Sequence, residues 1–438
     1  MKTAVKKITP KVILYFYHWL LALSSAVYFG FPSRSMIVIG VTGTKGKTST
    51  AYFIWNALNA AGLKTGIIST VVIGIDPPLA LNTLHMTMPG RFALQRHLAR
   101  MRHEKCEAAI VETTSQGIAQ ARHKGIDYDI LVFTNLTPEH IESHGSFEKY
   151  RSEKQKIFSA LMESRRKNLT RGRIPKVIIA SADTPESIHF LKYSADKKIT
   201  FGQNEDADIH AAGVEEGEGG IRFFVEDRHI SLSLHGVFNA VNALPAIAIG
   251  KLLNLNQEKI IDGLEKVASI PGRMEVIIQE PFLVIVDYAY EPASLEAALI
   301  NARKLVKPRG KVVAVFGAAG GGRDKQKRPI MGKIADEYAD IAILTTDDPY
   351  EENPITIAGE IASGFTHASQ RIRDKRLFEI TDRREAIQKA LSLARQGDVI
   401  LILGIGAEQS LVIGNKQIPW DDRMITREEY IKLKKIHA

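Results

Sequence analysis

From about residue 36 onward, short apolar runs alternate with segments whose apolar residues recur at helical spacing. Residues 48–62 show the helical pattern and end at a glycine, a common helix stop. Strand-like runs occupy residues 36–43, 64–74, 106–112, 129–135, 283–290, 311–320, 339–348 and 398–406. Strands that alternate with helices predict parallel sheets covered on both faces. The pattern therefore predicts an α/β protein.

Two segments depart from this alternation. Residues 209–234 have the pattern of a β-hairpin with an acidic, Gly-rich turn, whereas residues 163–176 are basic and irregular, which favours a surface connection. A further βα series starts near Pro271-Gly272. We therefore expect a leader over residues 1–35, a central domain over 36–270 and a C-terminal domain over 271–438.

The composition excludes several classes of protein. Of 438 residues, 45% are hydrophobic and 24% are charged, which excludes a disordered, collagen-like or polytopic membrane chain. The single cysteine, Cys106, excludes an internal disulfide and any zinc site with two thiolates, and suits a reducing cytoplasm. Of the net charge of +9, residues 1–35 contribute +5 without any acidic residue. The excess therefore gives no sign of a basic groove for nucleic acid.

A Gly-rich loop carries the strongest chemical signal. Gly43-Thr44-Lys45-Gly46-Lys47-Thr48-Ser49 lies between a predicted strand and a predicted helix, as a phosphate loop requires. Its backbone N–H groups would face the phosphates of ATP, Lys47 would reach the β- and γ-phosphates, and Thr48 would bind Mg²⁺. Only Val41, at the first glycine position of the pattern, departs from it.

The leader holds an uncharged apolar run from Val12 to Phe31 between two prolines. Twenty such residues could just span a bilayer as a helix. A helix packed on the body is the favoured interpretation, peripheral membrane contact through residues 12–31 is the alternative, and a cleaved signal peptide agrees least with an ATP site.

The loop resembles the G-T-x-G-K-T-S/T signature of the Mur ligase superfamily, and further motifs follow in that family's order from about Met36 to Arg423. The resemblance implies a P-loop central domain with a mostly parallel sheet and a Rossmann-like C-terminal α/β domain. By resemblance, Glu112, His140 and a carbamylated Lys154 would hold a second Mg²⁺. Oxygen ligands with one imidazole suit that ion.

The same resemblance assigns ATP contacts beyond the loop. These are Asn135, Asn239, Asn242, Arg273 and Asp287, with Lys327 as a further catalytic cation. Within the superfamily the chain is most similar to the tripeptide-synthesising ligases, which act on UDP-N-acetylmuramoyl dipeptide. That similarity implies substrate contacts at Ser69, Thr70, Thr87, Ser115, Arg122, Arg323, Asp347, Asp348, Gly404 and Glu408.

Three departures from the family pattern bear on function. Tyr350 replaces the arginine that grips the distal carboxylate of diaminopimelate, so the added amino acid stays open between diaminopimelate, lysine and similar residues. Tyr290 replaces a histidine. The leader stands where these ligases keep a UDP-binding domain.

The expected function is ATP-dependent amide formation, through an acyl phosphate, between a UDP-linked muramoyl peptide and a free amino acid. We expect a monomer in the cytoplasm, in contact with the inner membrane face if the leader binds lipid. A folylpolyglutamate synthetase-like ligase and a degenerate, membrane-associated ATP-binding scaffold are the alternatives.

Overall fold

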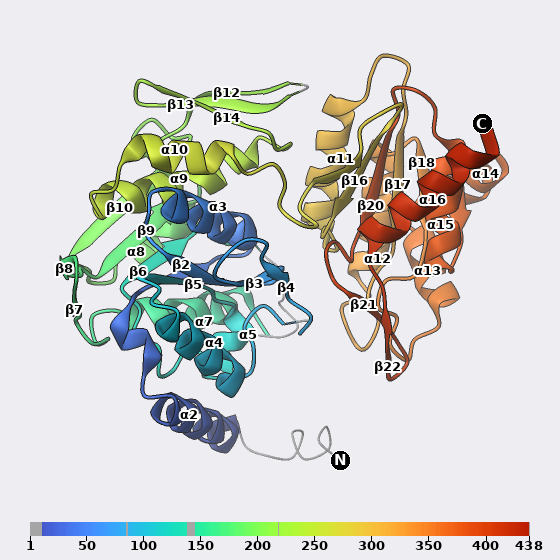
Figure 1. Cartoon of the computed structure of the whole chain (residues 1–438). Coiled ribbons are helices and arrows are strands. Elements are labelled where there is room, and N and C mark those ends of the chain that lie inside the picture. Colours follow the sequence, from blue (N-terminus) through green and yellow to red (C-terminus); the bar gives the residue numbers. More distant parts are fainter. Residues whose placement is uncertain (1–10, 85, 138–144, 218, 438) are drawn as a thin grey trace. The chain divides into compact units, whose positions relative to one another are not determined.

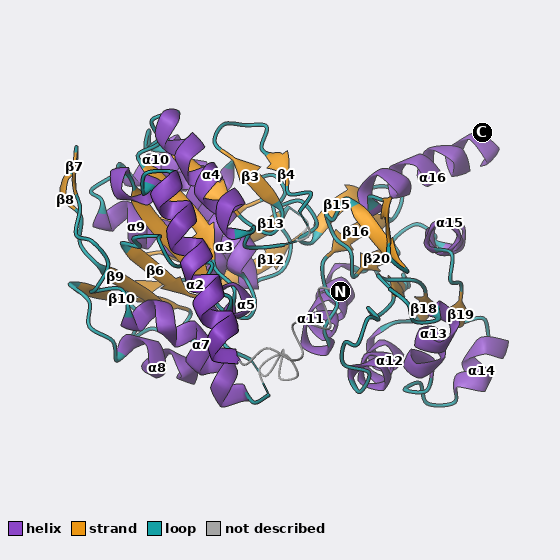
Figure 2. Cartoon of the chain, turned by 90° about the horizontal axis from the view of Figure 1, so that it is seen from below, coloured by secondary structure: helices purple, strands orange, loops and turns teal. Residues whose placement is uncertain are grey.

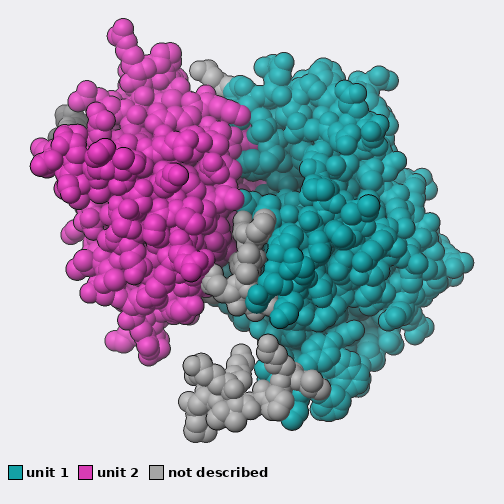
Figure 3. All heavy atoms as spheres, turned by 180° about the vertical axis from the view of Figure 1, so that it is seen from behind, with its two compact units in different colours: residues 1–233, 237–268 teal, residues 234–236, 269–438 magenta. Residues whose placement is uncertain are grey.

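The structure is a computed structural model that describes residues 11–84, 86–137, 145–217 and 219–437 (Figure 1). The chain forms two compact units, which Figure 3 shows in separate colours. Unit 1 comprises residues 1–233 and 237–268, and unit 2 comprises residues 234–236 and 269–438.

Unit 1 is built on a nine-stranded sheet in the order β11-β10-β9-β6-β1-β5-β2-β3-β4. The strands are parallel from β11 to β2, and β3 and β4 add an antiparallel edge. Their bounds are β1 Ile37–Thr42, β2 Thr65–Ile68, β3 Val72–Gly74, β4 Ala80–Leu81, β5 Ala108–Glu112, β6 Ile130–Phe133, β9 Val177–Ser181, β10 Lys197–Gly202 and β11 Ile209–His210.

Helices cover both faces of this sheet, as Figure 1 shows. On one face lie α3 (Lys47–Ala60), α9 (Phe238–Leu252) and α10 (Gln257–Glu265). On the other lie α4 (Arg91–His103), α5 (Ser115–Ala119) and α7 (Phe147–Ser159), with the short α8 (Ile188–Leu191) beside α7. A three-stranded antiparallel sheet, β12 (Ala212–Gly217), β13 (Gly220–Val225) and β14 (Arg228–Leu232), completes unit 1.

Unit 2 is built on a six-stranded sheet in the order β15-β16-β20-β17-β18-β19, parallel except for β15. The bounds are β15 Glu275–Ile278, β16 Leu283–Asp287, β17 Val312–Phe316, β18 Ile341–Leu344, β19 Leu377–Glu379 and β20 Val399–Leu403. A hairpin, β21 (Ser410–Ile413) and β22 (Lys416–Pro419), follows β20.

Two buried apolar clusters of unit 2 lie on opposite faces of its sheet. One includes Leu295 and Leu299 of α11 (Pro292–Leu305) and Met331 of α12 (Lys327–Tyr338). The other includes Ile387 of α15 (Arg383–Leu393) and Ile425 of α16 (Asp422–His437). The remaining helices are α13 (Pro354–Ala362) and α14 (Ala368–Arg373).

The predicted α/β class and strand runs are confirmed, but the single strand predicted over 64–74 is wrong. The run divides into β2 and β3, which pair antiparallel. Ser69 makes the turn, because its hydroxyl donates to the Val72 carbonyl at 3.0 Å and accepts from the Val72 N–H at 3.1 Å. Only Ser69 and Thr70 separate the apolar residues of the two strands, so the hydrophobic pattern predicts one strand instead of two.

The segment 163–176 is also less irregular than predicted. It holds the small hairpin β7 (Asn168–Leu169) and β8 (Gly172–Arg173), and two of its lysines are buried. Lys167 and Lys176 place their ammonium groups 2.5 and 3.0 Å from the two carboxylate oxygens of buried Asp129. The basic composition therefore reflects buried charge pairing as well as surface.

The leader forms helix α2 (Lys11–Tyr28), so the predicted helix is confirmed and ends three residues early. Figure 1 shows it at the edge of unit 1, and in Figure 2 it lies in front of the rest of that unit. Among the described helices, none combines the length and the apolarity that crossing a membrane requires.

Candidate active site

The predicted phosphate loop connects β1 to the N-terminus of α3. Gly43 and Gly46 have φ values of 151° and 78°, which favour glycine. A Cβ on Gly46 would lie 2.3 Å from Asn242 Oδ1, and one on Gly43 would lie 2.0 Å from Thr134 Oγ1. Both glycines are therefore required by neighbouring side chains as well as by the turn itself.

Asn135, at the end of β6, holds the loop from one side. Its Oδ1 accepts from the Lys45 N–H at 2.8 Å, and its carbonyl accepts from the Thr44 N–H at 2.9 Å. The Thr44 hydroxyl lies 3.1 Å from the Tyr150 hydroxyl, and the Lys47 ammonium donates to the Thr44 carbonyl at 2.7 Å. The loop is thus ordered by side chains from β6, α3 and α7.

Glu112, at the end of β5, is the central buried carboxylate of this site. Both of its oxygens lie 3.1 Å from the Thr48 hydroxyl. Thr70 donates to the same carboxylate from its N–H at 2.8 Å and from its hydroxyl at 3.0 Å. Glu112 therefore joins the first turn of α3 to the turn between β2 and β3.

The predicted substrate residues of unit 1 lie around this carboxylate or next to it in sequence. The Thr70 and Thr87 hydroxyl oxygens lie 2.9 Å apart, and Arg122 donates to the carbonyl of Met88. Burial lowers the pKa of Arg122. Ser115 is buried near the start of α5, whereas the Ser69 hydroxyl is engaged in the β2–β3 turn.

The described residues fit part of the predicted metal site. The Thr48 hydroxyl and the Glu112 carboxylate are oxygen donors beside the phosphate loop, as Mg²⁺ prefers. Lys154 is buried in α7, and its ammonium donates to the Gly43 carbonyl at 2.7 Å. His140 lies outside the described residues. Among the described residues, no three His, Cys, Asp or Glu side chains converge on one point.

The two predicted adenine contacts come from α9. Asn242 Nδ2 donates to Asn239 Oδ1 at 3.2 Å, which places the two amides side by side on one helix face. Since Asn242 also lies against Gly46, this face adjoins the phosphate loop.

In unit 2, the predicted ribose contact Asp287 and the predicted γ-phosphate contact Arg273 lie at the end of β16 and just before β15. Asp287, the last residue of β16, accepts from the Met274 N–H at 2.8 Å. Its surroundings raise its pKa through desolvation, although Arg273 opposes that shift. The Arg273 guanidinium lies 4.6 Å from the centre of the Tyr288 ring.

Tyr288 links this junction to Glu408, since its hydroxyl donates to Glu408 Oε1 at 2.5 Å. Burial and the nearby Glu408 carboxylate raise the pKa of Tyr288 well above its usual value. The sequence pattern did not assign a role to Tyr288. Its position directly after Asp287 was the available signal.

The predicted cations of unit 2 contact the tyrosines that depart from the family pattern. Lys327 donates to Glu291 Oε1 at 2.7 Å and to the Tyr290 carbonyl at 3.2 Å. Arg323 shares a side-chain hydrogen bond with Tyr350. Tyr350 has a φ of 51°, and its ring packs against Gly321.

Asp347 follows β18 and lies against the backbone of Gly404, which follows β20. A Cβ on Gly404 would approach Asp347 Oδ2 to 2.3 Å. That oxygen is buried and has no hydrogen-bond partner among the described residues. Desolvation raises the pKa of Asp347 to about 7. Asp348 instead accepts from the Val412 N–H at 2.7 Å and so fixes the start of the β21–β22 hairpin.

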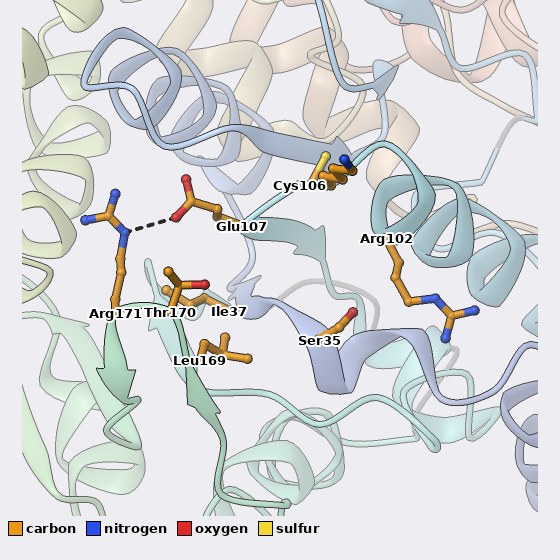
Figure 4. A pocket seen from close by; sticks show the side chains of 9 residues that line it. Ser35, Ile37, Arg102, Cys106, Glu107, Leu169, Thr170 and Arg171 are labelled. Atoms are coloured by element: carbon orange, nitrogen blue, oxygen red, sulfur yellow. Dashed lines mark hydrogen bonds and ion pairs between the residues drawn. The ribbon is translucent and has the colours of Figure 1, made fainter.

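A separate cavity of about 220 Å³ lies near the opposite end of β1, as Figure 4 shows. Arg102, Cys106, Glu107 and Arg171 are among its lining residues. Burial raises the pKa of the Cys106 thiol to about 11, which makes it a poor nucleophile. The cavity is therefore distinct from the phosphate-loop site.

Comparison with known proteins places these geometries in one family. Residues 41–250 match the Mur ligase middle domain, and residues 272–406 match the Mur ligase glutamate ligase domain. The UDP-N-acetylmuramyl-tripeptide synthetase of Roseiflexus is 36% identical, over 94% of this chain and 82% of that protein. The chain belongs to the Mur ligase family. It is therefore an ATP-dependent amide ligase.

Other relatives of this Mur ligase agree. The UDP-N-acetylmuramoyl-L-alanyl-D-glutamate–2,6-diaminopimelate ligase of Geobacillus thermodenitrificans is 37% identical, over 93% of this chain and 81% of that protein. A solved diaminopimelate ligase has a TM-score of 0.61 and 28% identity, over 91% of this chain and 79% of that one. Mycobacterium tuberculosis folylpolyglutamate synthase, complexed with ADP and AMPPCP, shares the fold, with a TM-score of 0.68 at 18% identity, over 88% of this chain and 92% of that one.

Proposed function

We propose that this Mur ligase adds an amino acid to a UDP-linked muramoyl dipeptide, with conversion of ATP to ADP and phosphate, in peptidoglycan precursor synthesis. The observation that carries this proposal is Glu112, which binds Thr48 of the phosphate loop and Thr70 of the predicted substrate segment with the same carboxylate. One residue thus couples the nucleotide side of the site to the muramoyl-peptide side. Similarity to tripeptide synthetases over most of their length supports the substrate class.

Unit 1 supplies the groups for phosphoryl transfer. Lys47 and the N-terminus of α3 would stabilise negative charge on the phosphates while the donor carboxylate attacks the γ-phosphate. Mg²⁺, proposed to bind Thr48 and Glu112, would neutralise phosphate charge when present. The amine of the amino acid would then attack the resulting acyl phosphate and release phosphate. Carbamylation of Lys154 and a ligand role for His140 remain proposals drawn from the resemblance.

Unit 2 supplies candidate groups for the incoming amino acid. Asp347 and Glu408 are carboxylates suited to an ammonium group. Tyr350, in place of a guanidinium, offers a hydroxyl but no positive charge to a distal carboxylate. We therefore keep both lysine and diaminopimelate as candidate acceptors. A cytoplasmic location, supported by the use of ATP and by a single, buried cysteine, and a monomeric state complete the proposal.

The test is ADP formation by the full chain with UDP-N-acetylmuramoyl-L-Ala-D-Glu and each amino acid in turn, with mass analysis of the product. Lys47→Ala should reduce turnover roughly a thousandfold, because it removes the phosphate-facing cation. Lys259→Ala, on the exposed side of α10, is the matched control and should retain activity. Ligation of glutamate to a folate donor, with no ADP formed on the muramoyl peptide, would replace this proposal by the folylpolyglutamate synthetase alternative.

A further inference from the structure

Helix α2 exposes an apolar face to solvent, interrupted by the exposed Ser24. Six of its seven exposed large apolar side chains lie on one face of the helix, and the seventh, Tyr15, lies on the other side. The six are Ile13, Phe16, Tyr17, Leu20, Val27 and Tyr28. The face continues onto α4 through Phe92, which is 47% exposed and lies 6.3 Å from the Tyr28 ring. Contiguous exposed apolar surface of this kind marks an interaction site.

The opposite face of α2 is fixed to unit 1. Ala22 and Ala26 are buried, and a Cβ on Gly125 would lie 2.6 Å from the Ala26 side chain, so the helix packs tightly there. Arg102 of α4 donates to the carbonyls of Phe29 and Gly30 at 3.0 and 2.9 Å and so caps the C-terminal end of α2. The apolar face is therefore held outward by rigid contacts, and Figures 1 and 2 agree that α2 lies on the outside of unit 1.

The charged side chains of α2 and α4 themselves have one sign. The chain has no acidic residue before Asp76, and the leader carries Lys2, Lys6, Lys7 and Lys11. Helix α4, which packs beside α2, also has no acidic residue, and its Arg96 and Arg100 are exposed. An apolar, aromatic-rich face on two helices that carry basic but no acidic residues complements an anionic lipid surface.

A second copy of the chain suits this face less well. A twofold interface would bring the same patch of both copies together, so the cations around α2 and α4 would oppose one another. A lipid bilayer with anionic headgroups can bind both the apolar face and the basic side chains. Aliphatic and aromatic side chains enter the membrane interface, while arginines and lysines contact phosphate groups.

We propose that the outer face of α2, together with the exposed arginines of α4, docks unit 1 on an anionic membrane surface. Phe16, Leu20 and Phe92 enter the interfacial region, and Arg96 and Arg100 contact lipid phosphates. Docking uses a surface distinct from the phosphate loop and the Glu112 site. The proposal does not depend on which substrate the ligase uses.

The test is co-sedimentation of the full chain with vesicles of phosphatidylcholine alone or mixed with phosphatidylglycerol. The wild-type chain should sediment with the anionic vesicles, and high salt should weaken that binding. The double variant Phe16→Ser, Leu20→Ser should bind about tenfold more weakly or worse, because each substitution removes apolar surface that would enter the interface. Arg96→Gln with Arg100→Gln should reduce binding and its salt dependence.

Ile188→Ser is the matched control, because Ile188 is 70% exposed on α8, away from this face, and its loss should leave vesicle binding unchanged. ATP-dependent ligation by soluble substrates should be equal in all these variants, which separates this proposal from the proposed function. The proposal is overturned if the wild-type chain stays in solution with anionic vesicles, or if the double variant binds as well as wild type. It is also overturned if light scattering shows a dimer that the double variant abolishes.

Discussion

Two buried carboxylates of unit 1 differ from one of unit 2 in how their charge is compensated. In unit 1, Asp129 has a lysine ammonium on each oxygen, and Glu112 accepts hydrogen bonds from Thr48 and Thr70. In unit 2, Asp347 keeps one buried oxygen without a hydrogen-bond partner among the described residues, and its pKa is raised to about 7. The first arrangement compensates the buried charge, whereas the second destabilises the folded state whenever Asp347 is charged.

This difference is informative about function. Asp129 lies just before β6, at the end of the strand opposite to Asn135 and the phosphate loop, and Lys167 and Lys176 of the fold itself supply its partners. Asp347 lies at the carboxyl ends of parallel strands, where ligands of such sheets bind. An ammonium group from an amino acid would provide the donor that its free oxygen lacks. The uncompensated carboxylate is therefore the one suited to a substrate.

The largest expected effect comes from removing the negative charge of Asp129, which is paired with two lysines in unit 1. Asp129→Asn should lower the free energy of unfolding by about 3 kcal/mol, because it leaves the buried ammonium groups of Lys167 and Lys176 with a neutral partner. Urea denaturation measures the change. Asp127→Asn is the control, since Asp127 pairs with partly exposed Arg34 and should contribute less than about 1 kcal/mol. If both variants lose the same free energy of unfolding, the two lysines do not make Asp129 a special, compensated buried charge.

Part of the candidate active site could be predicted from the sequence, because its residues belong to short, continuous motifs. The phosphate loop follows a strand and Glu112 ends one, each in a recognisable pattern, and the structure brings Thr48, Glu112 and Thr70 together. The two lysine partners of Asp129 are 38 and 47 residues away from it in sequence, and Tyr288 and its partner Glu408 are 120 residues apart. No local pattern encodes such pairings, so lysines 167 and 176 were assigned to the surface. His140 stays a prediction.

The next effect concerns the compensated carboxylate that lies in the candidate active site. Glu112→Gln should reduce turnover about a hundredfold, since the amide removes the negative charge proposed to bind Mg²⁺. The Mg²⁺ concentration that gives half-maximal rate should rise as well, and ADP release at varied Mg²⁺ measures both quantities. Glu107→Gln, in an exposed ion pair with Arg171 before the same strand, should change neither. An unchanged Mg²⁺ requirement in Glu112→Gln would remove Glu112 from the proposed metal site.

The smallest expected effect is a gain in stability, and it comes from replacing Asp347 in unit 2. The folded state raises the pKa of Asp347 from its usual 3.8 to about 7, so it binds this proton more tightly than the unfolded chain does. The stability that this proton provides is complete below about pH 4 and is lost as the pH rises towards 7. Asp347→Asn should remove that loss and raise the free energy of unfolding at pH 8 by about 2 kcal/mol, while changing little at pH 4.

Thermal denaturation from pH 4 to pH 8 measures this dependence, and Asp374→Asn, at an exposed carboxylate of the same unit, is the control. The free amino acid accepted by the ligase should narrow the gap between wild type and Asp347→Asn at pH 8, because its ammonium group would compensate the charge in the wild-type chain alone. A variant that is less stable than wild type at pH 8 would show that Asp347 is already compensated. The charge of Asp347 would then be compensated like those of Asp129 and Glu112, and Asp347 would no longer be the carboxylate suited to the amine of the amino acid.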